Sequence, residues 1–183
     1  MTLGSLFDGI AGFPLAAERQ GIKTIWISEI EPNCTDIAKR HFPDAENLGD
    51  ITKIDGGNIP AVDIISFGSP CQDLSVAGEQ KGLDGARSGL FMEAVRIVRE
   101  MRKKTNGQYP KYIIWENVAG AFSSNKGEDF RRVLEEITET NISMPKSGKW
   151  ANAGMVGIER AGGGGSVHRM AVVGCSILGS TPT

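Results

Sequence analysis

The chain has 183 residues, of which 40% are hydrophobic, with a formal net charge of −2 and a pI of about 5.8. This length suffices for one domain with a buried core and excludes two large domains. The near-neutral charge argues against a dedicated DNA-binding module, so any contact with DNA must be local or supplied by another polypeptide.

Apolar runs rich in β-branched residues alternate with segments of helical periodicity over residues 1–140. Strands are predicted at residues 3–7, 23–28, around 50–52, 63–67 and 112–115. Helices are predicted at residues 13–20, 33–41, 88–103 and 129–138. This alternation predicts an α/β fold with a mostly parallel sheet and helices on both faces. Residues 141–183 show no clear periodicity, and we expect them to form an irregular, glycine-rich tail.

The three cysteines, Cys34, Cys71 and Cys175, are an odd number without a Cys-x-x-Cys spacing. This pattern argues against a disulfide framework or a structural zinc site and is typical of a reducing cytosol. The sequence shows no signal peptide, and no apolar run approaches the ~18 residues of a membrane span. We therefore expect a cytoplasmic protein with no membrane partner and no bound metal.

A turn with two glycines, residues 7–12, joins the first strand to the first helix. Its glycines allow backbone N–H groups to approach a ligand, although an ordinary tight turn would have the same composition. Glu29 ends the second strand about twenty residues later, where a carboxylate can accept hydrogen bonds from ribose hydroxyls. It could equally cap the helix that begins near Pro32. Together the turn and the acid favour a cofactor that contains adenosine.

Cys71 follows the fourth predicted strand, and Pro70 stiffens the turn that presents it. A thiol at the end of a parallel strand is well placed for nucleophilic chemistry, yet a single cysteine is more often a small buried apolar residue. Glu116 follows the fifth strand, where burial could raise its pKa and allow proton donation near neutral pH. The alternative is a carboxylate held by backbone N–H groups. The glycine-rich loop at 77–87 is either a lid or a plain exposed loop.

Five motifs, in order and in register over about residues 2–140, resemble those of the DNA (cytosine-5-)-methyltransferases. They are Leu6-Phe7-Asp8-Gly9-Ile10-Ala11-Gly12-Phe13, Glu29, Gly49-Asp50-Ile51-Thr52, Gly68-Ser69-Pro70-Cys71-Gln72 with Ser75, and Glu116-Asn117-Val118. The resemblance implies a Rossmann-like, S-adenosylmethionine-dependent methyltransferase fold, incomplete at its C-terminal side. It further implies methyl transfer from S-adenosyl-L-methionine to carbon 5 of a cytosine flipped out of double-stranded DNA.

The same resemblance implies residue roles. Cys71 would be the nucleophile and Glu116 the acid, with Asn117 shaping the pocket. The cofactor site would be lined by Phe7, Gly9, Gly12, Glu29, Asp50, Ile51 and Gly68. The substrate would contact Pro70, Gln72, Ser75, Arg87 and Val118.

The family's arginine-rich motif, target-recognition region and final helix have no counterpart in this sequence. Three interpretations therefore stay open: a truncated methyltransferase, a remnant that modifies nothing, or one half of a split enzyme whose partner chain carries the recognition region. RNA is a further substrate to consider, since a transfer-RNA branch of the family shares the catalytic motif. Back-translation of residues 168–178 with free choice of codons allows family-like residues in a shifted frame, which suggests a frameshifted or split gene; the alternative is a divergent tail.

Overall fold

The computed structural model describes residues 1–68, 89–117, 119–151, 154–158 and 168–174. The strands are β1 (Thr2–Leu6), β2 (Lys23–Ser28), β3 (Glu46–Asn47), β4 (Ile64–Gly68), β5 (Tyr112–Asn117), β6 (Gly154–Ile158) and β7 (His168–Gly174). The α-helices are α1 (Gly12–Glu18), α2 (Pro32–His41), α3 (Gly89–Lys104) and α4 (Glu128–Thr138). Short 3-10 helices are η1 (Ile51–Lys53), η3 (Ala119–Phe122) and η4 (Ser124–Gly127).

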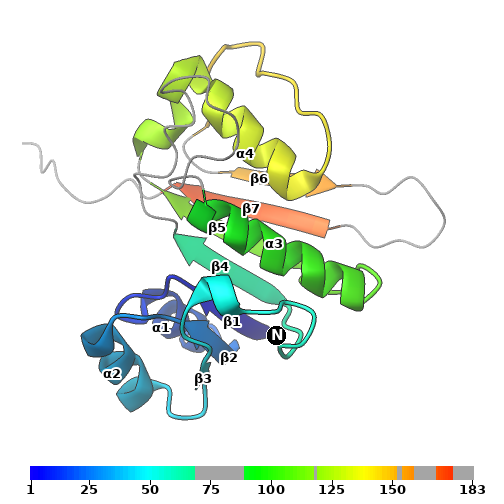
Figure 1. Cartoon of the computed structure of the whole chain (residues 1–183). Coiled ribbons are helices and arrows are strands. Elements are labelled where there is room, and N and C mark those ends of the chain that lie inside the picture. The colour runs from blue at the N-terminus through cyan, green and yellow to red at the C-terminus, as the bar shows by residue number, and fades with distance from the viewer. Residues whose placement is uncertain (69–88, 118, 152–153, 159–167, 175–183) are drawn as a thin grey trace, which may run out of the picture.

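The strands form one sheet in the order β3-β2-β1-β4-β5-β7-β6 (Figure 1). Every neighbouring pair is parallel except β6 and β7, which are antiparallel. The predicted α/β fold with a mostly parallel sheet is confirmed. The order reverses direction between β1 and β4, the kind of switch point at which open α/β sheets bind ligands.

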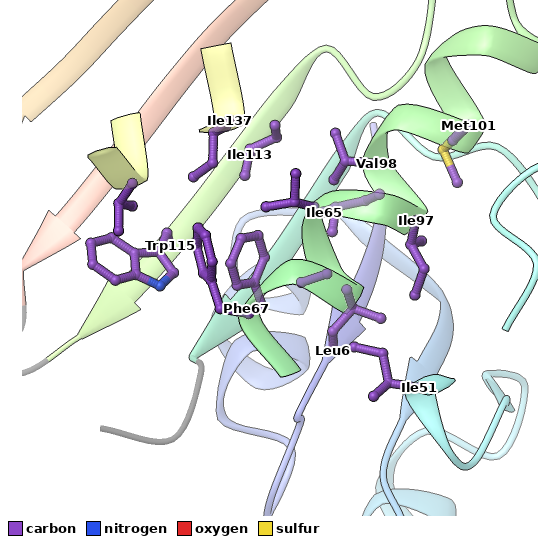
Figure 2. Close-up of a cluster of buried hydrophobic side chains, with 14 of the residues drawn as sticks. Leu6, Ile51, Ile65, Phe67, Ile97, Val98, Met101, Ile113, Trp115 and Ile137 are labelled. Carbon is purple, nitrogen blue, oxygen red and sulfur yellow. The ribbon is translucent and has the colours of Figure 1, made fainter. Parts of the chain in front are cut away.

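Helices cover both faces of the sheet, as the strand–helix alternation predicts. Helices α3 and α4 lie over one face (Figure 1), where their apolar sides bury Leu6, Ile65, Phe67, Ile113 and Trp115 (Figure 2). Smaller clusters on the other face pack Leu3 and Ile64 with α1, and Ile27 with α2. Because side chains alternate along a strand, β1, β2, β4 and β5 each contribute residues to clusters on both faces.

Residues 50–52 lie near a short strand, as expected, because β3 ends at Asn47. They themselves form a turn that becomes η1, because the Asp50 carboxylate accepts hydrogen bonds from the backbone N–H and the hydroxyl of Thr52. One expectation from the sequence is wrong: residues 141–183 are not wholly irregular, because β6 and β7 lie there. Strand β7 pairs with the edge of β5 from Tyr112 to Asn117 and satisfies its backbone N–H and C=O groups.

Candidate active site

The carboxyl ends of four parallel strands meet at one edge of the sheet. Leu6 of β1 pairs with Ser28 of β2 and with Phe67 of β4, and Gly68 pairs with Glu116 of β5. The loops that follow these strands therefore start side by side. The ends of these strands and the loops that follow them carry most of the described residues to which the sequence assigned roles.

Glu29 joins two of these loops through its carboxylate. Oε2 accepts a hydrogen bond from the Gly9 backbone N–H at 2.7 Å, and Oε1 accepts from the Ile30 and Glu31 N–H groups at 2.8 Å each. A carboxylate offers about four acceptor positions, so these three bonds leave one on Oε2. Oε1 thus holds the backbone just before α2, whose N-cap residue is Glu31, and Oε2 keeps an acceptor for a ligand hydroxyl, as the ribose interpretation requires.

The turn between β1 and α1 adopts an unusual backbone path. Phe7, Gly9 and Ala11 have φ angles of +53°, +58° and +67°, in the left-handed region that side-chain-bearing residues rarely adopt. A Cβ atom added to Gly9 or Gly12 would meet no atom within 4 Å. The glycines therefore leave open space at this edge, where a ligand can approach the backbone.

Asp8 lies beneath this turn and was not singled out by the sequence. Only 6% of it is exposed; Oδ1 accepts a hydrogen bond from the Ser5 hydroxyl, whereas Oδ2 is buried without a partner among the described residues. Burial raises the pKa of Asp8 to about 6, against the lowering effect of the Ser5 hydrogen bond and with a further rise from the charge of Glu29. A carboxyl group titrating near pH 6 therefore sits under the glycine turn.

Asp50 and Ile51 are brought to the same edge by contacts from β2. The Ser28 hydroxyl donates to the Gly49 carbonyl at 2.7 Å. Asn47 accepts from the Glu29 and Gly49 N–H groups through Oδ1 and donates to the Glu29 carbonyl through Nδ2. Sequence reasoning missed Asn47, whose only signal was an Asn two residues before a glycine turn. Its amide links the Glu29 loop to the Asp50 turn.

Glu116 and Gly68 form the part of the edge nearest to Cys71 in the sequence. A Cβ atom on Gly68 would lie 2.8 Å from Glu116 Oε2, so the carboxylate rests against the Gly68 backbone. Glu116 is half-buried, and Asn117 beside it is 2% exposed. The lack of a side chain at residue 68 thus sets the position of the Glu116 carboxylate.

Comparison with known proteins identifies this arrangement. The family model described as C-5 cytosine-specific DNA methylase matches residues 1–150. The chain belongs to the C-5 cytosine-specific DNA methylase family. This match extends ten residues beyond the boundary that we placed at residue 140.

Among its relatives, the type II methyltransferase M.NlaIV of Neisseria lactamica is 34% identical over 73% of the chain and 31% of its own length. A DNA N-6-adenine-methyltransferase of Escherichia phage P1 is 35% identical over 66% of the chain and 17% of its own length. The chain thus spans less than a third of either relative. A solved structure of an E. coli prophage putative DNA modification methyltransferase shares the fold, with a TM-score of 0.59 at 20% identity over 85% of the chain and 39% of that protein.

Six predicted site residues lie outside the described residues: Pro70, Cys71, Gln72, Ser75, Arg87 and Val118. Their roles stay predictions. Within the described ranges, no group of acidic, histidine and cysteine side chains is arranged to hold a metal ion. None of the helices described is long and apolar enough to cross a membrane.

Proposed function

We propose that this chain is the cofactor-binding and catalytic portion of an enzyme that methylates carbon 5 of cytosine in DNA. The observation that carries the proposal is the pairing of Gly68 with Glu116 at the edge that also holds Glu29 and the Asp50 turn. Cys71 follows Gly68 by three residues, which limits their Cα–Cα separation to about 10 Å. This supports the proposal that a thiol, a carboxylate and a nucleoside site share one region.

The hydrogen-bond acceptors at this edge suit S-adenosyl-L-methionine. Glu29 Oε2 retains an acceptor for a ribose hydroxyl, and Asp50 Oδ2, which lies 3.6 Å from Lys53 Nζ, can accept from an amino group. Phe7, Gly9, Gly12, Ile51 and Gly68 would complete the cofactor site. The bound cofactor would supply the methyl group.

The reaction assigns one step to each catalytic side chain. The Cys71 thiolate forms a bond to carbon 6 of the flipped cytosine, and the displaced electron pair makes carbon 5 nucleophilic. Glu116 supports protonation of ring nitrogen 3, and Asn117 shapes the pocket around the base. After methylation, loss of the carbon 5 proton expels the thiolate and restores the ring. Pro70, Gln72, Ser75, Arg87 and Val118 would contact the substrate.

Trapping with DNA that contains 5-fluorocytosine tests the proposal. Fluorine replaces the carbon 5 hydrogen, so there is no proton whose loss could expel the thiolate. The covalent adduct therefore persists and shifts the protein on a denaturing gel. We expect Cys71→Ala to abolish the adduct and Cys34→Ala, a substitution of the half-buried cysteine in α2, to retain it. An adduct that survives Cys71→Ala would overturn the mechanism.

The same experiment separates the alternatives. An adduct formed only after adding a second chain with the target-recognition region would establish a split enzyme, and no adduct under either condition would establish a remnant. RNA carrying the same analogue tests the transfer-RNA alternative. The phage P1 relative is named for adenine, so product nucleosides should also be analysed: 5-methylcytosine supports the proposal, and N6-methyladenine contradicts it. With DNA as substrate, we place the activity in the cytoplasm.

A further inference from the structure

We infer that Arg96 is a positioning residue for the proposed cofactor site, because its guanidinium ties helix α3 to the turn that carries Asp50 and Ile51. The inference rests on the proposed function, since that turn matters only if it binds the cofactor. It adds a residue that does not itself line the proposed site.

Arg96 hydrogen-bonds the backbone at both ends of η1. Its Nη1 donates to the Ile54 carbonyl at 2.7 Å, and its Nη2 donates to the Ile51 carbonyl at 3.1 Å. The Ile51 carbonyl also accepts the Ile54 N–H at 3.3 Å within the turn, and the Ile54 carbonyl follows the turn. A planar guanidinium can reach both carbonyls at once, and this holds the turn in one orientation on α3.

Two glutamates of α3 hold the guanidinium in place. Arg96 Nε donates to Glu93 at 2.8 Å, and Nη1 donates to the two Glu100 oxygens at 3.0 and 2.8 Å. Glu100 Oε2 also accepts from the Gly56 N–H at 2.7 Å. A Cβ on Gly56 would lie 2.4 Å from the Ile97 carbonyl, so this part of the loop lies directly on the helix. The segment from Ile51 to Gly56 is therefore attached to α3 at both ends.

Helix α4 contains a matched arginine that lacks these backbone bonds. Arg131 donates to Glu128 at 2.7 Å and to Glu135 at 2.6 Å, with the same three- and four-residue spacings. Its side chain is 28% exposed, compared with 33% for Arg96. Among the described residues it donates only to these glutamates. Both arginines thus gain the modest stabilisation of intrahelical ion pairs, and only Arg96 adds a connection to a loop.

The attachment has a consequence for the site. Helix α3 begins at Gly89, directly after residues 69–88, which include Cys71. The helix held by Arg96 is therefore the one that continues the Cys71 segment. Arg96 thus fixes the turn proposed to bind the nucleoside against the helix that follows the proposed nucleophile in the sequence.

Calorimetric titration with S-adenosylhomocysteine tests the inference on the whole chain. We expect Arg96→Met to raise the dissociation constant at least tenfold and Arg131→Met to change it less than twofold. Arg96→Lys restores the charge between the glutamates without the two-carbonyl fork, so we expect its affinity to stay within threefold of Arg96→Met. Hydrogen exchange of the Thr52, Lys53 and Ile54 amides should accelerate in both Arg96 variants and not in Arg131→Met.

Wild-type affinity in Arg96→Met, full recovery in Arg96→Lys, or an equal loss in Arg131→Met would each overturn the inference, because helix stability or charge would then explain the effect. If Arg96→Met does not fold, Arg96→Lys decides by the same criteria. If the wild-type chain does not bind S-adenosylhomocysteine, the proposed function fails. The exchange rates of residues 52–54 would then still decide whether Arg96 holds the turn.

Discussion

Gly68 and Glu116 face each other across β4 and β5, and the space above the Gly68 Cα atom is occupied by the Glu116 carboxylate. This contact joins the strand that leads to Cys71 with the proposed acid. The far end of a glutamate can move aside at little cost. A side chain at residue 68 should therefore disturb chemistry more than stability.

We expect Gly68→Ala to lower the yield of the 5-fluorocytosine adduct at least tenfold, because the added methyl group displaces the carboxylate. The free energy of unfolding should change by less than about 1 kcal/mol, since alanine is favoured over glycine in a strand. Gly89→Ala provides a control, because a Cβ there meets no atom within 4 Å. Equal adduct yields for both variants would show that the Glu116 position is unimportant.

Glu29→Gln should weaken both the fold and the cofactor site. One of the oxygens that accept the Gly9, Ile30 and Glu31 N–H groups becomes an NH₂ donor, which leaves at least one of these groups unsatisfied. We expect a loss of about 1–3 kcal/mol in the free energy of unfolding and weaker binding of S-adenosylhomocysteine. Chemical denaturation and calorimetry measure the two effects. Glu31→Gln is the control, because Glu31 caps α2 without a side-chain hydrogen bond.

Asp8→Asn should make the protein more stable above pH 6. Burial raises the pKa of Asp8 from 3.8 to about 6 in the folded state, so the folded protein holds this proton more tightly than the unfolded chain. The free energy of unfolding therefore falls as the pH rises from 3.8 to about 6. The shift corresponds to about 3 kcal/mol, at 1.36 kcal/mol for each pKa unit. The asparagine variant should match wild type below pH 3.8 and exceed it by up to this amount above pH 6.

Asp50→Asn is the matched control for pH. Hydrogen bonds from Thr52 lower the pKa of Asp50, so its contribution is present above pH 3.8 and is lost as pH falls. Urea denaturation from pH 3.5 to 7.5 should therefore show effects of opposite sign for the two substitutions. A pH-independent difference between Asp8→Asn and wild type would contradict the assignment.

Gly4→Ala tests the core beneath the site. A Cβ at residue 4 would lie 2.1 Å from the Trp26 ring, which is fully buried and donates from Nε1 to the Pro60 carbonyl at 2.9 Å. The ring cannot move aside without losing this bond, so we expect a destabilisation of about 1–3 kcal/mol or more. Gly120→Ala, where a Cβ meets nothing within 4 Å, should be close to neutral by thermal denaturation.

Local patterns were sufficient to predict four of the seven strands and the four α-helices among the described residues, but not the order of the strands in the sheet. The β-branched run at residues 23–28 coincides with β2, and helix α3 begins and ends within one residue of its prediction. These elements are readable because periodicity and β-branching act over a few neighbouring residues. The turn at Asp50 was harder to predict. The sequence did not reveal that the Asp50 carboxylate would accept hydrogen bonds from Thr52 and close a turn.

Sequence alone determined the family, the strand-end placement of Gly9, Glu29 and Glu116, and the proposed chemistry, because these depend on residue types at short spacings. Only the tertiary structure decided that β7 completes the edge of β5, that Glu29 binds three backbone amides, and that Arg96 holds the Asp50 turn. Each of these is a contact between residues far apart in the chain, or a hydrogen bond for which several alternative partners exist. Such choices depend on which groups the packed sheet brings within about 3 Å of one another.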